Sequence, residues 1–190
     1  MACDLTAGRL TPCKDSLGGI KNLYLVDFGD PTFTINESGS DEITDINGTF
    51  SYAKYEVKGD ASMEATLTSS RENGTTFFEQ NITANLRKLT KEDNKELKLM
   101  AYGRPHVLVE TRDGKLFWVG TENGCEVTGG TAVTGTALGD LQGYTLTLQA
   151  MEKFYPNEFH PSGTPNPADA DYPFDTITGT ATALSANTPT

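Results

Sequence analysis

Histidine and cysteine are the side chains in this sequence best suited to metal binding or nucleophilic catalysis, and both are scarce. Neither His106 nor His160 has a second histidine, a cysteine or a carboxylate at metal-ligand spacing. Cys3, Cys13 and Cys125 are equally scattered, so free thiols are expected, with a Cys3–Cys13 disulfide left open. The sequence therefore predicts neither a metal centre nor a bound cofactor.

Carboxylate and hydroxyl groups do acid–base or nucleophilic chemistry only when a partner group is held beside them. Asp41-Glu42 is a pair of acids in a polar stretch, whereas Glu92-Asp93 begins a predicted helix. No serine lies in a nucleophile-elbow pattern, and Asp140 is not followed by the alternating oxygen ligands of a calcium loop. We therefore do not expect an enzyme.

The element that could carry a functional surface is a long β-hairpin predicted over residues 61–88. Both arms alternate apolar and polar residues, Gln80 being the one exception, and the turn over residues 70–74 contains Asn73-Gly74. Its polar positions are Ser62, Glu64, Thr66, Thr68, Glu79, Asn81, Thr83, Asn85 and Arg87. A period of two predicts a sheet with one face on a core and the other in water.

Strand patterns dominate the rest of the chain. They cover residues 20–28, 32–35, 42–46, 49–57, 107–111, 115–120, 131–138 and 144–154. One helix is predicted over residues 90–103, with Thr90 as its N-cap and with Leu97, Met100 and Ala101 facing the sheet. The expected fold is mainly β, a β-sandwich or partly rolled barrel with one flanking helix.

Composition divides the chain into three parts. Residues 1–19 are rich in turn formers and predict an extended arm, and residues 20–155 form the β-sandwich domain. Residues 156–190 are rich in Pro and Thr and have no Lys or Arg, so they are interpreted as an appended surface extension with an edge strand near residues 175–182.

The formal net charge of −11 argues against a surface that binds nucleic acid, because such surfaces need clustered cations. It argues equally against binding to anionic membranes. The chain also shows neither a leader-like start nor an apolar run of about 18 residues, so no membrane association is expected.

Two groups of residues resemble the major tail tube proteins of certain tailed bacteriophages. The first is Cys3-Asp-Leu-Thr-Ala-Gly8-Arg9 with Pro12-Cys13-Lys14-Asp15 and Gly18-Gly19-Ile20; the second is residues 128–131 with 135–140 and 143–147. The resemblance covers about residues 1–153 and gives residues 156–190 no counterpart. It implies a structural protein of the virion tail, present in the host cytoplasm during assembly.

The resemblance also implies how such a protein works. Subunits join their sheets into a hexameric ring around a lumen, the rings stack into a tube, and a long hairpin reaches the neighbouring ring. The implied partners are other copies of the chain, and a tape-measure protein and transiting DNA, neither bound specifically in the lumen. Tail terminator, baseplate or sheath proteins would meet the finished tube.

Within that picture, we expect the polar face of the hairpin to line the lumen. The candidates are Glu64, Thr66, Thr68, Glu79, Asn81, Thr83 and Asn85. Their acids would repel DNA within about 10 Å, the screening length at moderate salt. Candidates for contacts between subunits or rings are Arg71, Glu72, Asn73, Arg87, Arg9 and Lys14. In a second hypothesis the arm over residues 1–19, rather than the hairpin, locks one ring to the next.

Two other classes of protein stay open. One is a carbohydrate-binding β-sandwich module, which would present exposed aromatic rings; Trp118 lies in an all-apolar run, which weighs against it. The other is a capsid-decorating protein, which the resemblance does not favour.

Overall fold

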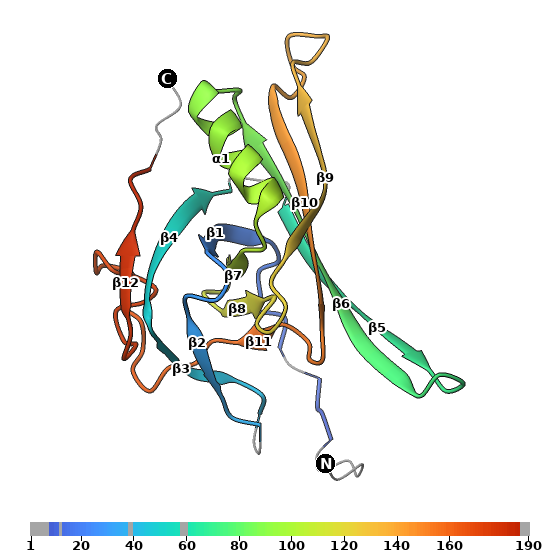
Figure 1. The fold of residues 1–190 in the computed structure, drawn as a ribbon, viewed down its shortest axis with the longest axis vertical. Helices are drawn as coiled ribbons and strands as arrows, with labels where there is room; N and C mark the ends of the chain where they lie inside the picture. The colour runs from blue at the N-terminus through green and yellow to red at the C-terminus, as the bar shows by residue number, and fades with distance from the viewer. Residues whose placement is uncertain (1–7, 12, 38–39, 58–60, 187–190) are drawn as a thin grey trace.

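Figure 1 shows the computed structural model, which describes residues 8–11, 13–37, 40–57 and 61–186. The fold is mainly β with one helix, as expected, and its sheets do not close into a barrel. The elements are β1 (Ile20–Val26), β2 (Thr32–Ile35), β3 (Ile43–Asn47), β4 (Thr49–Glu56), β5 (Ala61–Ser70), β6 (Thr75–Arg87), α1 (Lys91–Tyr102), β7 (His106–Thr111), β8 (Leu116–Val119), β9 (Glu126–Val133), β10 (Gly143–Glu152), β11 (Asn157–Glu158) and β12 (Thr180–Ala183).

Two large sheets carry the architecture. One has six strands in the order β11-β8-β7-β1-β4-β12, and the other has four in the order β5-β6-β10-β9. Strands β2 and β3 form a separate two-stranded sheet. The predicted hairpin is confirmed as β5 and β6, joined by a turn over residues 71–74 in which Gly74 has a φ of 63°.

A first apolar core lies between the two large sheets. Leu23, Val107 and Val109 from the six-stranded sheet meet Ile82 and Leu148 from the four-stranded sheet, and all five are buried. Because each of these strands turns alternate side chains inward, two sheets that share this core form a sandwich. Gln80 lies in the same inward row as Ile82, so the residue that broke the hairpin pattern points into the core.

A second apolar core covers the opposite face of the six-stranded sheet. Tyr24, Phe50 and Trp118 from that sheet pack with Phe159 and Phe174 from the C-terminal segment. The rings of Tyr24 and Phe174 meet edge to face at 6.1 Å between centroids, and those of Phe50 and Phe174 at 5.4 Å. The central strands β1, β7 and β8 of the six-stranded sheet are therefore buried on both faces.

The C-terminal segment is thus more than a surface extension. Phe159 and Phe174 are 4% exposed each, so the expectation of an appended surface segment is wrong at these positions. The segment supplies β11 beside β8 at one edge of the six-stranded sheet and β12 beside β4 at the other. The expected edge strand near residues 175–182 is confirmed as β12.

Helix α1 begins and ends close to its prediction. The Thr90 side chain accepts a hydrogen bond from the backbone N–H of Asp93 at 3.1 Å, as an N-cap should. Met100 packs against the first core and Leu97 is half-buried, but Ala101 is exposed, so its predicted contact with the sheet is wrong. The helix covers the sandwich with only a narrow apolar stripe.

Strand β9 departs most from its prediction. It runs over Glu126–Val133 rather than residues 131–138, because Gly135 has a φ of 72° and opens a loop. Residues that carry a Cβ rarely adopt a positive φ, whereas glycine does so readily. The earlier start pairs β9 with β10 from Glu126 opposite Gln149 to Val133 opposite Gly143, with one register shift between Thr147 and Leu148.

Candidate functional site

The outward face of the four-stranded sheet gathers polar side chains from all four strands. In one row across the sheet Glu64, Asn81, Gln149 and Glu126 lie opposite one another in turn. The neighbouring rows are Ser62, Thr83, Thr147 and Gly129 on one side and Thr66, Glu79 and Met151 on the other; Asn85, Thr145 and Thr131 form a further row. Six of the seven predicted lumen residues therefore share one face of the sheet, which we call the polar face. The seventh, Thr68, lies opposite Phe77 on the part of the hairpin that extends beyond β10.

Hydrogen bonds tie this face together across strands. Glu79 Oε1 accepts from Gln149 Nε2 at 2.7 Å and from Asn81 Nδ2 at 3.0 Å. Thr145 Oγ1 donates to Asn85 Oδ1 at 2.7 Å. These bonds hold five of the polar side chains of the face in place, namely Glu79, Asn81, Asn85, Thr145 and Gln149.

Sequence reasoning missed the contribution of β9 and β10 to this face. Thr145, Thr147 and Gln149 alternate with apolar residues, so their direction was visible. The pattern does not reveal that β10 pairs with β6, because alternation within a strand carries no information on its register with a strand far away in sequence.

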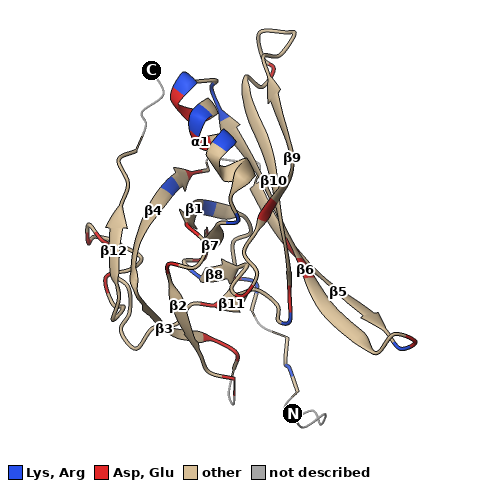
Figure 2. Ribbon diagram, viewed as in Figure 1, with Lys and Arg blue, Asp and Glu red and all other residues tan. Residues whose placement is uncertain are grey.

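The polar face carries acids and almost no cations. Glu64, Glu79 and Glu126 lie on it, while Arg87, at the exposed end of β6, is the only Lys or Arg in the four strands. Figure 2 shows the same contrast: these ribbons bear red segments with hardly any blue. An anionic polymer near this face would be repelled.

The two edges of the four-stranded sheet are open among the described residues. Strand β5 is ten residues long and β9 eight, and neither pairs with a strand on its outer side. Neither contains Lys, Arg or Pro, the residues that commonly protect an edge from further pairing. Each edge is a template for a strand from another chain.

The tip of the hairpin extends beyond the sheet. Pairing of β6 with β10 stops at Phe78, so residues 68–77 continue as a two-stranded ribbon, which projects from the body in Figure 1. Arg71, Glu72 and Asn73 lie exposed in its turn. At the base of the ribbon Leu67 is 49% exposed. The tip of the hairpin is therefore exposed and lies away from the body of the subunit.

A second projection leaves the opposite end of the same sheet. The loop over residues 134–142 joins β9 to β10, and in Figure 1 it lies at the far end from the hairpin turn. Asp140 holds it by accepting from the backbone N–H groups of Thr136 at 2.8 Å and Ala137 at 2.7 Å, and these bonds lower the pKa of its carboxyl. The side chain of Leu138 is fully exposed on this loop.

The described part of the N-terminal arm is exposed. Arg9 and Lys14 lie on it, and the backbone N–H of Leu17 donates to Asp113 Oδ1. Cys13 is an exposed free thiol and Cys125 a buried one, while Cys3 lies outside the described residues. The prediction of an extended arm also covers residues 1–7 and 12, which lie outside the described residues.

His106 has a structural role. It is 2% exposed, its Nδ1 hydrogen bonds to Gly120 O, and its Nε2 accepts from the backbone N–H of Gly29 at 3.3 Å. Burial lowers the pKa of His106, although the Gly120 bond and nearby Asp30 oppose the shift. A neutral imidazole therefore links the β1–β2 turn to the end of β8.

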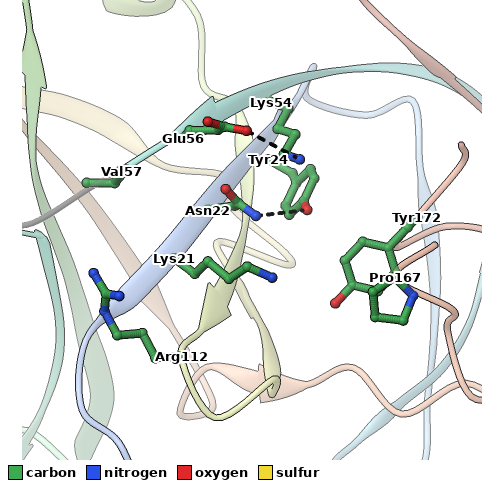
Figure 3. Close-up of a pocket in the computed structure, with 9 residues that line it drawn as sticks. All are labelled: Lys21, Asn22, Tyr24, Lys54, Glu56, Val57, Arg112, Pro167 and Tyr172. Atoms are coloured by element: carbon green, nitrogen blue, oxygen red, sulfur yellow. Dashed lines mark hydrogen bonds and ion pairs between the residues drawn. The ribbon is translucent and has the colours of Figure 1, made fainter. Parts of the chain in front are cut away.

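A hollow lies beside β1 and β4, and Pro167 and Tyr172 line its other side (Figure 3). Its volume is about 620 Å³, and Lys21, Lys54 and Arg112 line it. Lys54 lies 3.9 Å from Glu56, and Lys21 Nζ lies 2.6 Å from Glu110 Oε1. Two of these three cations are therefore already paired.

Glu110 anchors the wall of that hollow. The carboxylate is 1% exposed and accepts from Asn22 Nδ2 at 2.6 Å and from Tyr24 OH at 2.9 Å, in addition to Lys21. Burial alone would raise the pKa of Glu110, but these hydrogen bonds outweigh it and lower the pKa. Burial and the negative charge of Glu110 raise the pKa of Tyr172 to about 12. This arrangement stabilises the fold and presents no free base.

Chemistry beyond these groups is sparse in the described residues. They contain no cluster of three or more His, Cys, Asp or Glu side chains able to hold a metal ion. No helix among them is long and apolar enough to cross a membrane. Compared with known protein families, curated proteins and solved structures, the chain has no match in any of the three.

Proposed function

We propose that this chain is a structural subunit that assembles through its four-stranded sheet into rings, and that the rings stack into a phage tail tube. The observation that carries the proposal is the contrast at the sheet edges. The six-stranded sheet ends in strands of two and four residues, whereas the four-stranded sheet ends in the longer strands β5 and β9, which contain no Lys, Arg or Pro.

Ring closure is the assembly that such edges favour. Pairing β5 of one copy with β9 of the next satisfies both rows of backbone donors and acceptors, and repetition around an axis removes the last free edge. The sheets of the ring would then form one continuous barrel. The single subunit stays an open sandwich.

The polar face would line the inside of that barrel. Its surface is hydrogen-bonded and carries Glu64, Glu79 and Glu126. Repeated in every subunit, these acids would keep DNA from adhering to the wall while it passes. The same face would hold a tape-measure protein without binding it specifically.

Edge pairing can be tested by proline substitution in β5. Adjacent residues of a strand direct their N–H groups to opposite sides, so of Ala65 and Thr66 one donates to β6 and the other points outward. Single variants Ala65→Pro and Thr66→Pro are made, and folding is checked by thermal melting. The variant with proline at the outward-pointing N–H should have the melting temperature of the wild-type monomer but should form no rings in negative-stain electron microscopy.

Ala183→Pro in β12 is the matched control, because the N–H groups of Thr180 and Leu184 donate toward β4 and the N–H of the intervening Ala183 therefore points away from the sheet. It should leave rings and tubes intact. The proposal fails if the wild-type protein stays monomeric at high concentration, or if both β5 variants form rings as the wild type does.

The lumen assignment has its own test. Glu64→Lys with Glu79→Lys should give tubes of normal width that retain DNA, with DNA delivery reduced at least tenfold. Glu56→Lys with Glu158→Lys on the six-stranded sheet changes the net charge equally and serves as the control. Unimpaired delivery through otherwise normal tubes would sink the lumen assignment.

The N-terminal arm gives a second hypothesis for ring-to-ring contact. Arg9 and Lys14 are exposed on it, so they are available to a neighbouring ring. Deleting residues 1–19 should yield single rings or monomers. Tubes of normal length from that deletion would assign stacking to other elements.

The rival carbohydrate-binding module receives little support. Trp118 is completely buried and packs edge to face with Phe33 at 4.8 Å between ring centroids. It offers no exposed platform on which a sugar ring could stack. A glycan-array screen gives the direct check, with binding above background favouring the rival.

A further inference from the structure

Helix α1 turns a row of basic residues away from the body of the protein. Lys91, Lys95, Lys98 and Tyr102 follow at intervals that place them on one helix face. All four are exposed, Tyr102 by 81%, and the adjacent Leu99 is exposed by 55%. Lys95 and Lys98 take part in no ion pair within the described chain. Among the described residues, Lys95 and Lys98 on this helix face therefore have no acidic partner.

The acids of the helix do not neutralise this row. Asp93 and Glu96 are half-buried on the side that faces the body, where their charge adds to burial in raising the pKa of Tyr55. Glu92 lies 3.4 Å from Lys91, at the first turn only. The outer face around Lys95 and Lys98 is therefore positive, on a chain whose formal net charge is −11.

An acidic surface lies at the other end of the molecule. Residues 27–45 contain six acids and no Lys or Arg. Asp27, Asp30 and Glu37 are exposed, Asp41 and Glu42 are half-exposed, and none of these five takes part in an ion pair within the described chain. We call the part around Glu37 and Glu42, where β2 joins β3, the acidic end.

Figure 2 shows where these two surfaces lie on the long axis. The blue segments of α1 gather near one end of the ribbon, and the red segments between β2 and β3 lie toward the other. The two charges cannot meet within one molecule. They can meet when copies follow one another in the same orientation along that axis.

We infer that the exposed face of α1 in one copy docks on the acidic end of the next copy along the long axis. The partner is a second copy of this chain. Charge complementarity draws the surfaces together, and the apolar side chains of Leu99 and Tyr102 add contact area at the seam. A heterologous contact repeated by translation produces an open-ended stack. The inference rests on the proposed function, since it assigns the charges that join successive rings.

The test is a charge swap. Lys95→Glu with Lys98→Glu should leave single rings in negative-stain images and abolish tubes. Adding Glu37→Lys with Glu42→Lys to the same chain should restore tubes to at least half their wild-type length, because the attraction is rebuilt with opposite signs. Lys54→Glu with Lys115→Glu changes the net charge equally and should leave tubes unaffected.

Outcomes for the inference and for the proposed function are separable. A wild-type protein without rings contradicts the proposed function. Normal rings and normal tubes from the helix variant overturn the inference alone, as does a swap that fails to restore tubes. A closed dimer bridged by the same residues would also overturn it. Salt gives a second readout: wild-type tubes should shorten between about 0.1 M and 1 M NaCl, as the screening length falls from about 10 Å to about 3 Å.

Discussion

The two large sheets of this protein differ in whether the C-terminal segment supplies their edge strands. The C-terminal segment places β11 on one edge of the six-stranded sheet and β12 on the other, and Phe159 and Phe174 pack against the face between them. The four-stranded sheet receives no such cover among the described residues, and its outer strands are long. The edges of the six-stranded sheet are therefore occupied by short strands, whereas those of the four-stranded sheet are the long strands that we propose pair between subunits.

The largest loss of stability is expected from removing Phe174, whose ring packs against one face of the six-stranded sheet. Phe174→Ala should lower the free energy of unfolding by about 3–5 kcal/mol, because a buried aromatic ring is replaced by a cavity. Urea denaturation of the monomer measures it. Leu184→Ala, at a side chain 54% exposed just beyond β12, is the control and should cost far less. Equal losses from both variants would deny Phe174 its anchoring role.

A smaller effect is expected at the link between the two sheets. Gln80, which is 1% exposed, donates to Phe154 O at 2.8 Å and accepts from the Gly120 N–H at 3.2 Å. Gln80→Ala should cost about 1–3 kcal/mol, since two buried backbone groups lose their partner. Thermal melting is the measurement, with Gln149→Ala on the polar face as the control. A Gln80 variant as stable as the wild type would contradict the link.

Acid should lower the free energy of unfolding through His106, which lies in β7 of the six-stranded sheet. Its pKa is lowered in the folded protein, mainly by burial, so below the ordinary value of about 6.5 the unfolded chain binds a proton that the folded chain does not. Stability conferred by neutral His106 is thus present above about pH 6.5 and is lost as the pH falls. Unfolding free energies between pH 5 and 8 should rise with pH, and His106→Gln should flatten that rise. An unchanged slope would exclude His106 as its source.

The smallest effect is expected on the polar face. Glu64 is exposed, so Glu64→Gln should change the free energy of unfolding by no more than about 0.5 kcal/mol. Chemical denaturation of the monomer checks this. A large loss in the free energy of unfolding would mean that the polar face also stabilises the subunit. The two sheets would then differ less in their contribution to stability.

Sequence reasoning located the elements better than their partners. The alternation in residues 61–88 predicted the hairpin and the side on which each polar residue lies, and the capping pattern at Thr90 placed α1. These are local signals, which depend on neighbouring residues. The β9 limits were wrong because the small residues around Gly135 fit a strand and a loop equally well.

Long-range placement escaped sequence reasoning. Nothing around Phe174 indicates that its ring meets Tyr24 and Phe50, since a single aromatic residue among prolines has no period. The row that joins Glu64, Asn81 and Gln149 likewise depends on the pairing of distant strands. The sequence pattern therefore predicted the β5 and β6 residues of the polar face, but not that residues of β10 and β9 extend the same face.

The route of the C-terminal segment has a consequence for biosynthesis. Thr178 N–H bonds to Asp45 Oδ1 across a separation of 133 residues, and β12 pairs with β4 beside it. A ribosome delivers β4 long before β12, so the edge of β4 waits unpaired while the intervening chain is made. Contacts this distant slow folding and leave an aggregation-prone interval. Nascent chains should therefore depend on chaperones until Phe174 and β12 have emerged.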